Sequence, residues 1–145
     1  MIDNLQDYFG SELQIFLDSI SYNRIENDTN SSRGKISLIC RDDINVLLND
    51  NGVRIIIKRT LTLDPKTFFA LGVSFGADLR FNSRKNEHDW SEINLAEEFR
   101  KNGGFVTDQL MSRISLLIGQ ITAASGQQPI LLPPTVIKEN QSQEE

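Results

Sequence analysis

The sequence is poor in the residues that build disulfides and metal centres: its 145 residues include one cysteine, one histidine and one tryptophan. Cys40, as the single cysteine, excludes an internal disulfide and a cysteine metal cluster. His88 lies in the polar stretch Asn-Glu-His-Asp, and no second imidazole exists to complete a histidine metal site. We interpret His88 as a solvated loop residue and expect neither a metal ion nor another cofactor.

Long apolar runs, a leader segment and a phosphate loop are missing as well. No run approaches the ~20 apolar residues that a membrane helix needs. The N-terminus, Met-Ile-Asp-Asn, lacks the basic and apolar regions of a signal peptide. The glycines at 72, 76 and 103–104 lack the spacing and the following Lys-Ser/Thr of a phosphate-binding loop. We therefore expect a cytoplasmic protein that neither inserts into membranes nor uses ATP.

Acidic residues outnumber basic ones, 20 to 15, but the net charge of −5 is unevenly spread. Residues 33–85 carry ten basic and five acidic side chains, whereas 1–32 and 86–145 each carry a net −5. A basic central third is compatible with nucleic-acid binding. Here, however, the charges alternate with apolar residues, as on a solvated sheet face, and no RNA-binding aromatic motif or basic helix accompanies them. We expect no nucleic-acid partner.

The clearest pattern in the sequence is the strict alternation from Phe69 to Phe81. All seven odd positions are apolar and all six even positions are small or polar, which predicts a long strand with one buried face. The even face is nearly flat, because Gly72, Ser74 and Gly76 carry little side chain. Glycine within a strand often marks a bend, a bulge or another backbone coming close, so we expect a backbone or a partner to approach this face.

Two earlier segments also alternate as strands do. Residues 12–22 form the first. Residues 35–41 and 44–48 form a second strand, which we expect to break or bulge at Asp42-Asp43. Cys40 lies on the apolar face of this strand, so we interpret it as a packing residue and not as a nucleophile.

A hairpin turn joins the second strand to the next. The segment Asn49-Asp50-Asn51-Gly52 predicts this turn, because Asn and Gly both tolerate positive φ. Residues 53–63 form the return strand, and Asp64-Pro65-Lys66 turns the chain into the long strand. The first 81 residues therefore predict a four-stranded antiparallel meander with one apolar face.

The hydrophobic period then changes from two to about 3.6, which predicts two helices. Asn94 is a favourable N-cap and Glu97 stands at the N3 position, an arrangement typical of a capping box. Gly103-Gly104 ends this short helix, and residues 105–124 predict a long one.

The long helix carries a wide apolar stripe, formed by Val106, Leu110, Met111, Ile114, Leu117, Ile118 and Ile121. Soluble monomers avoid exposing an apolar surface of this size, and contact with one sheet does not require so wide a stripe. The stripe therefore predicts a homo-oligomer interface, although ordinary core packing has the same signature.

Gly126 ends the long helix, and prolines follow at 129, 133 and 134. The apolar run Ile130-Leu131-Leu132 lies between them and cannot be helical, because proline lacks the N–H and restricts the residue before it. We expect this segment to be extended and held in a groove or against the sheet.

This order of elements resembles the SecB family of bacterial export chaperones. The likeness covers about residues 12–137 and rests on two stretches. Val53–Phe81 is similar to that family's central hairpin. The second stretch is Phe105–Ile137, in which Gly126–Ile137 is similar to the family's helix end and proline-flanked tail. The resemblance implies an α+β fold, a four-stranded antiparallel sheet followed by a short and a long helix. Residues 1–137 then form a single domain, with a disordered acidic tail at 138–145.

The resemblance also implies a homotetramer, a dimer of dimers, that holds unfolded polypeptide in apolar grooves. Some members of the family deliver such clients to the export motor SecA through an acidic sheet face, and others serve one client, such as an antitoxin. This sequence departs from the family in two ways. Its net charge is only −5 with a basic middle, and Gln127-Gln128 stands where the family often has Gly-Phe before its proline.

The client-binding groove is predicted to be lined by Phe68, Ile93, Leu95, Phe99, Ile130, Leu131 and Leu132. Phe68 lies on the opposite parity from the buried face of its strand, and Leu95 and Phe99 lie on a helix too short to be stable alone. The alternative is that these residues are simply core.

Three functions remain open at this point. The first is an ATP-independent chaperone that holds unfolded polypeptides. The second is a non-chaperone interaction or regulatory module of the same fold, dedicated to one partner such as an antitoxin. The third is an enzyme, whose best constellation would be Asp42, Asp43, His88 and Asp89. These lie in polar turns without the spacing of a nucleophile site, so we expect no enzyme.

Overall fold

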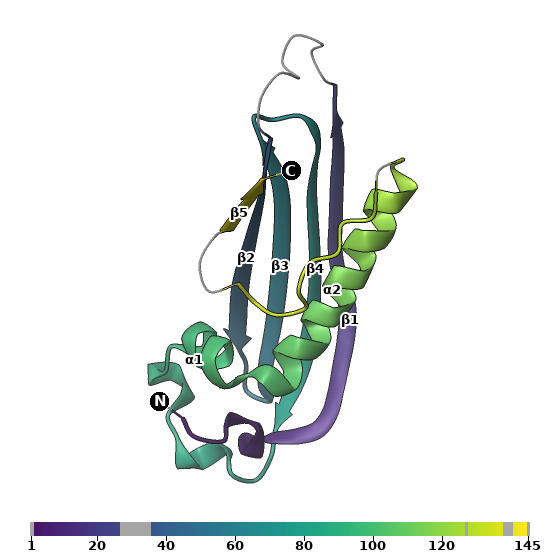
Figure 1. Cartoon of the computed structure of the whole chain (residues 1–145). Helices are drawn as coiled ribbons and strands as arrows, with labels where there is room; N and C mark the ends of the chain where they lie inside the picture. The colour runs from purple at the N-terminus through teal and green to yellow at the C-terminus, as the bar shows by residue number, and fades with distance from the viewer. Residues whose placement is uncertain (1, 27–35, 127, 138–140, 145) are drawn as a thin grey trace.

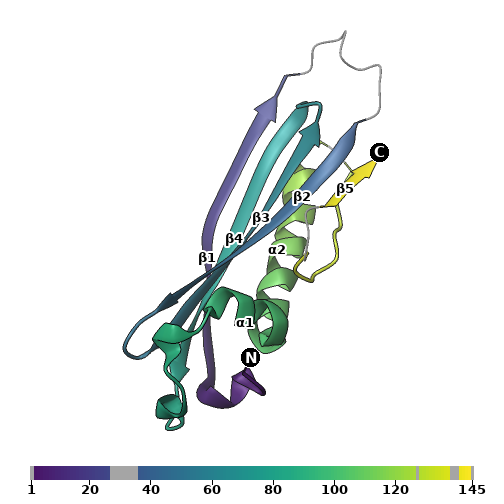
Figure 2. The ribbon, with the colours of Figure 1, turned by 90° about the vertical axis from the view of Figure 1, so that its left-hand side faces the viewer.

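The structure is a computed structural model that describes residues 2–26, 36–126, 128–137 and 141–144. One antiparallel sheet carries both helices and the segment that follows them on a single face (Figures 1 and 2). The elements in chain order are η1 (Leu5–Tyr8), β1 (Phe9–Ile25), β2 (Ser37–Leu48), β3 (Gly52–Asp64), β4 (Phe68–Phe81), η2 (Lys85–Glu87), η3 (Trp90–Glu92), α1 (Leu95–Asn102), α2 (Gly104–Ala124) and β5 (Gln141–Glu144). The predicted α+β class and the short and long helices are confirmed.

The strand order in the sheet is β1-β4-β3-β2-β5, so the prediction of a simple meander is wrong for β1. Short turns force β2, β3 and β4 to lie side by side as consecutive hairpins. The connection from β1 to β2 is longer, and it lets β1 lie beside β4 instead, in a Greek-key order. The long alternating strand β4 is thereby central, with β1 on one side and β3 on the other.

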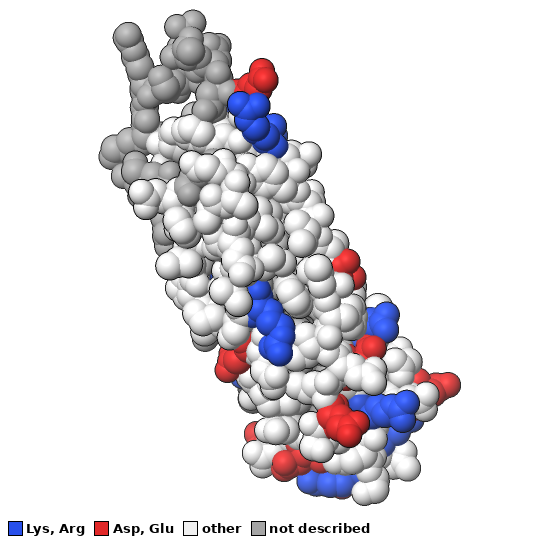
Figure 3. Space-filling view, turned by 90° about the vertical axis from the view of Figure 1, so that its right-hand side faces the viewer, with Lys and Arg blue, Asp and Glu red and all other residues white. Residues whose placement is uncertain are grey.

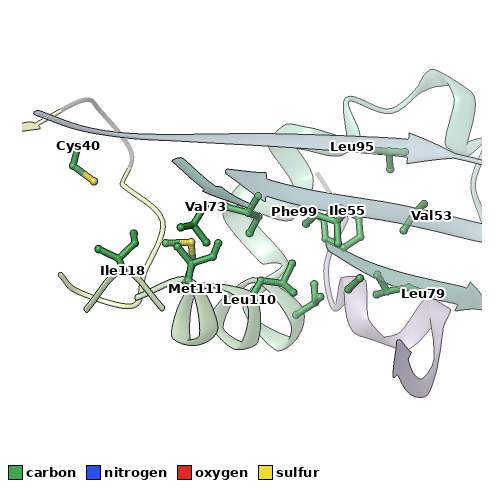
Figure 4. Close-up of a cluster of buried hydrophobic side chains, with 14 of the residues drawn as sticks. Cys40, Val53, Ile55, Val73, Leu79, Leu95, Phe99, Leu110, Met111 and Ile118 are labelled. Atoms are coloured by element: carbon green, nitrogen blue, oxygen red, sulfur yellow. The ribbon is translucent and has the colours of Figure 1, made fainter. Parts of the chain in front are cut away.

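The core lies between the sheet and α2, and Figure 4 shows its side chains filling this space. The period-two pattern of β3 and β4 sends alternate apolar residues to this face, where Ile55, Ile57 and Val73 are fully buried. From α2, the residues Val106, Leu110, Met111, Ile114 and Ile118 meet them and are also fully buried. At its N-terminus, α1 begins as predicted, with the Asn94 side chain accepting a hydrogen bond from the Glu97 N–H.

A β-bulge in β1 explains why its sequence alternates imperfectly. The register shifts between Leu17 and Ser19, which leaves Asp18 as the extra residue. Before the bulge the odd residues face α2, and after it the even residues do. Ile20, which breaks a strict alternation, therefore lies on the same face as Leu17 and pairs with Val73.

The second strand is continuous, so the prediction that it breaks or bulges at Asp42-Asp43 is wrong. Both residues pair in register within β2, opposite Arg59 and Lys58 of β3. Asp42 points into the core face and is buried, whereas Asp43 is exposed on the other face. A buried partner for Asp42 keeps the strand intact where the sequence alone indicated a turn.

The hairpin turn between β2 and β3 is where it was predicted, but not because of positive φ. Neither Asn51 nor Gly52 is among the described residues with a left-handed backbone. The Asn49 side chain accepts hydrogen bonds from the N–H groups of both. Gly52 is needed for close approach, since a Cβ there would lie 1.8 Å from the carbonyl oxygen of Leu79 on β4.

The flat even face of β4 is covered by side chains of neighbouring strands. The ring of Phe16 lies against Gly76, with its Cζ 2.4 Å from where a Cβ would stand. The Lys58 side chain lies in the same way over Gly72, with its Cε 3.1 Å from where a Cβ of residue 72 would stand. The close contacts at Gly72 and Gly76 therefore come from side chains of β1 and β3 of the same chain, and not from another backbone as predicted.

The acidic tail predicted to be disordered lies partly outside the described residues, which omit 138–140 and 145. Residues 141–144 form β5, an antiparallel neighbour of Ser37–Cys40 at the edge of β2. The disorder of residues 138–145 as a whole stays a prediction.

Candidate functional site

The segment that follows α2, residues 128–137, runs back along that helix and then crosses the sheet towards β2 (Figures 1 and 2). We call it the closing segment. It has no regular secondary structure, so it is not helical, as its prolines predict. Its backbone groups therefore need partners outside a helix or a ladder.

A buried ion pair supplies most of these partners. The Arg59 guanidinium donates two parallel hydrogen bonds to the Asp42 carboxylate, at 2.8 and 2.7 Å, and neither side chain is exposed. The same guanidinium donates to the carbonyl oxygens of Pro133 and Thr135, both at 2.9 Å, and to the Ser115 hydroxyl at 3.4 Å. Burial opposes its charge, but the hydrogen bonds and charge of Asp42 outweigh this and hold the pKa of Arg59 above its usual range.

Three further hydrogen bonds fix the two ends of the closing segment. At its start, the Ile130 N–H donates to the Thr122 hydroxyl of α2 at 2.9 Å. At its end, the Ile137 N–H donates to the Asp42 carboxylate at 2.9 Å, and Arg100 of α1 donates to the Ile137 carbonyl at 3.1 Å. Together with the contacts of Arg59, these bonds tie the segment to β2, β3, α1 and α2.

The ordered backbone presents apolar side chains to solvent. Leu131 is 79% exposed and lies over Gly119 of α2, where a Cβ would be 3.0 Å from its Cδ2. Leu116, one turn earlier on the same helix, is 63% exposed. Ile130 and Leu132 flank Leu131 and are half-buried against the core. We call Leu116, Ile130, Leu131 and Leu132 the leucine surface.

The seven residues of the predicted groove are not brought together. Phe68 begins β4, whereas Ile93, Leu95 and Phe99 follow its opposite end, so the length of the strand separates them. Phe99 is fully buried and packs on Phe9 and Phe105, and Leu95 is only 8% exposed. These two are core residues, the alternative that the sequence left open. Of the predicted set, Ile130, Leu131 and Leu132 remain together at one surface.

The predicted oligomer interface is divided in a similar way. Val106, Leu110, Met111, Ile114 and Ile118 are fully buried against the chain's own sheet, so they have no surface to offer to a second copy in this conformation. Leu117 and Ile121 are half-buried and remain candidates.

The position of these two residues on α2 follows from the contacts of its other flank. On that flank, Ser115 accepts a hydrogen bond from Arg59, Gly119 lies under Leu131, and Thr122 accepts a hydrogen bond from the Ile130 N–H. This flank of α2 therefore faces the closing segment. By helix geometry Leu117 and Ile121 lie on the opposite flank, on the side of β1 (Figure 1). On β1, Leu17 and Ile20 are 50% and 46% exposed on the same face of the sheet.

Sequence reasoning missed the ion pair, although a signal for it exists. Arg59 occupies a core-facing position of β3, in register with Ile57 and Leu61, and Asp42 occupies one of β2. Two opposite charges at inward positions of consecutive strands joined by a hairpin predict a buried pair. The segment that completes their hydrogen bonds lies far along the chain, and no local pattern points to it.

The four residues of the enzyme hypothesis do not form one cluster: Asp89 stays beside His88 in the loop after β4, and its carboxylate accepts a hydrogen bond from the Ser91 N–H. Asp42 is paired with Arg59, and Asp43 lies on the other face of the sheet. His88 lies near the end of β4, where it hydrogen-bonds to the Tyr8 hydroxyl at 3.0 Å and packs edge-on against Tyr8 and Trp90. It is half-buried and joins η1 to the loop after β4, so its interpretation as a solvated loop residue is wrong.

The face of the sheet away from α2 has balanced charges. Arg54 and Asp78 form a two-pronged exposed pair there, at 2.7 and 3.0 Å, and the hydrogen bond from Arg54 lowers the pKa of Asp78. Lys58 stands opposite Asp43 in the register of β2 and β3, so a basic and an acidic residue are also neighbours there. This face does not present the uniformly acidic surface that the family resemblance associates with SecA docking.

Cys40 provides a native reporter for the closing segment. Its side chain points from β2 towards the side where Ile118 and the closing segment lie (Figure 4). Burial raises the pKa of the thiol to about 11, so the reactive thiolate is scarce at pH 8. We expect alkylation of native Cys40 by N-ethylmaleimide at pH 8 to be slow, and to become fast in denaturant. Fast labelling of the native protein would contradict its burial.

The fold that these elements define is that of the SecB-like chaperones. The solved structure of the SecB-like chaperone Rv1957 of Mycobacterium tuberculosis, in complex with a ChAD peptide from the HigA1 antitoxin, matches this chain with a TM-score of 0.68. The match covers 89% of this chain and 88% of that one, at 14% sequence identity. No protein-family model and no curated protein sequence matches the chain. None of the described helices is long and apolar enough to cross a membrane.

Proposed function

We propose that this protein is an ATP-independent, SecB-like chaperone of the cytoplasm that binds extended segments of unfolded polypeptide at the leucine surface. The observation that carries the proposal is the exposure of Leu131 on the proline-flanked closing segment, where it lies over Gly119 of α2, one turn from the exposed Leu116. A contiguous apolar patch on the surface of a soluble protein often marks an interaction site. A peptide from an antitoxin is bound to the SecB-like chaperone of the same fold, which supports a polypeptide as the ligand.

The energetics favour a ligand with several apolar side chains. Burying one apolar client residue contributes roughly 1.5–3 kcal/mol, so two or three in succession give useful affinity without a specific hydrogen bond. The closing segment is already tied at both ends, which lowers the entropy lost when a client binds. Such a surface tolerates many sequences, as a holding chaperone requires.

Suppression of aggregation tests this function. We expect the protein to keep several chemically unrelated, denatured clients soluble without nucleotide. Replacing Leu116 and Leu131 together by serine is expected to abolish this protection while the melting temperature stays close to that of the parent, because both side chains are mostly exposed.

Leu47→Ser is the matched control for this experiment. Leu47 is 51% exposed but lies on β2, away from the closing segment. The control variant should protect clients as the parent does. Equal protection by all variants would refute the leucine surface as the binding site. Protection of one client only would favour the dedicated single-partner module.

We further propose that the chain forms a homo-oligomer, a tetramer built as a dimer of dimers, and that the flank of α2 that faces β1 supplies one of its two interfaces. Leu17, Ile20, Leu117 and Ile121 form this second apolar surface. Figure 3 shows the side of the molecule that carries β1 and α2, with a long, mostly uncharged band and charges gathered at its lower end. A second copy covering this band would remove it from water.

Light scattering tests the oligomer. We expect a mass well above the 16.4 kDa of one chain at micromolar concentration. The variant Leu17→Ser/Ile20→Ser should shift the particle towards the monomer, because it places two polar groups in the contact. A parent particle of monomer mass would overturn this proposal and leave the client proposal standing. We do not extend the proposal to SecA, because the charges of the outer sheet face are balanced.

A further inference from the structure

The Asp42–Arg59 pair is fully buried, and both of its side chains also form hydrogen bonds with groups outside the pair. Both side chains are fully buried, so each has lost its hydration. A buried ion pair is often no more stabilising than apolar residues of similar volume, because desolvation offsets the attraction between the charges. What an apolar pair cannot do is bind backbone groups. Arg59 binds two carbonyl groups of the closing segment, and Asp42 binds one of its N–H groups.

The closing segment needs this kind of support because of its own composition. Pro129, Pro133 and Pro134 have no N–H, so the segment cannot join the sheet as a regular strand. Its carbonyl groups at 133 and 135 face the sheet and are satisfied by one guanidinium. Without Arg59 these groups would need water, and the segment would leave the sheet to reach it.

We propose that the buried Asp42–Arg59 pair is a positioning element of the client-binding surface. It holds the closing segment in one extended conformation, so that Ile130, Leu131 and Leu132 stand as an ordered apolar wall beside α2. The pair does not touch the client; it acts through the backbone of the segment. This inference rests on the proposed function, and it assigns the affinity for unfolded polypeptide partly to two charges inside the core.

The test replaces both charges at once, in the variant Asp42→Leu/Arg59→Met. Removing both partners leaves no unpaired buried charge, so we expect the melting temperature to remain close to that of the parent. Hydrogen exchange within residues 128–137 should become faster. Alkylation of Cys40 should also become faster, because the segment no longer stays against β2.

Binding is measured with a permanently unfolded probe, reduced and carboxymethylated α-lactalbumin. The double variant should bind it about tenfold more weakly, because the segment must now be ordered at the moment of binding. The control is Arg54→Met/Asp78→Leu, which removes a pair of the same geometry from the exposed face of the sheet. It should change neither the exchange of the closing segment nor the affinity.

A second variant covers the case in which the double variant fails to fold. Thr122→Val keeps the volume of the side chain but removes the acceptor of the Ile130 N–H. It should weaken binding in the same direction, by a smaller factor, and speed exchange at the start of the segment. Unchanged affinity in a folded variant whose closing segment exchanges faster would overturn the positioning role alone. If the parent itself binds no probe, the proposed function fails first.

Discussion

Replacing Arg59 alone by methionine is expected to lower the free energy of unfolding by roughly 3–5 kcal/mol, the range seen when one partner of a buried ion pair is removed. The Asp42 carboxylate would stay buried without its counter-charge, and the carbonyl groups of Pro133 and Thr135 would lose their donor. Equilibrium denaturation in urea, followed by circular dichroism, measures the change. The effect should far exceed that of removing both charges together.

The exposed pair provides the control for this prediction. Arg54→Met removes an arginine whose contacts to Asp78, 2.7 and 3.0 Å, match those of Arg59 to Asp42. Because water solvates both groups, the loss of stability should be small. Similar losses for Arg54→Met and Arg59→Met would show that burial does not control the strength of these pairs, and the prediction would fail.

Replacing Gly52 by alanine is expected to cost at least the upper part of the ~1–3 kcal/mol typical of overpacking. The added Cβ would lie 1.8 Å from the Leu79 carbonyl oxygen and 2.9 Å from the Arg80 Cα. Both atoms belong to the backbone of β4, so no side chain can rotate to make room, and β3 and β4 must separate at their ends. Thermal unfolding of the variant measures the loss.

Gly10→Ala is the matched control, since Gly10 also lies in a strand near Arg80. There the nearest heavy atom to an added Cβ is the Arg80 carbonyl oxygen at 3.8 Å, an ordinary contact. The control should melt within a few degrees of the parent. A Gly52→Ala variant that melts with its control would mean that glycine at this turn serves only backbone flexibility.

The sequence determined the elements whose cause is local. The alternation of β4 predicts its buried face, because a strand exposes alternate residues to opposite sides. Asn94 begins α1 through its own side chain, and the prolines of the closing segment exclude a helix. The two helices, their lengths and the α+β class follow from periodicity in the same way. Of the candidate site, the extended run Ile130-Leu131-Leu132 was predictable for this reason alone.

The tertiary structure decided everything that depends on residues distant in sequence. A stripe on α2 has the same periodicity whether a sheet or a second copy covers it, and only the packed chain shows that Leu110 and Ile114 are core whereas Leu117 is half-buried. Phe68 and Phe99 look equivalent as apolar residues of the sequence. In the fold, Phe68 begins β4, whereas Phe99 lies in α1, which follows the opposite end of that strand. In the sequence, Asp42 resembles a residue that breaks a strand. In the folded chain, its carboxylate accepts hydrogen bonds from Arg59 and from the N–H of Ile137, 95 residues away. Burial and hydrogen bonding between distant segments are properties of the folded chain, and no local pattern encodes which partners will meet.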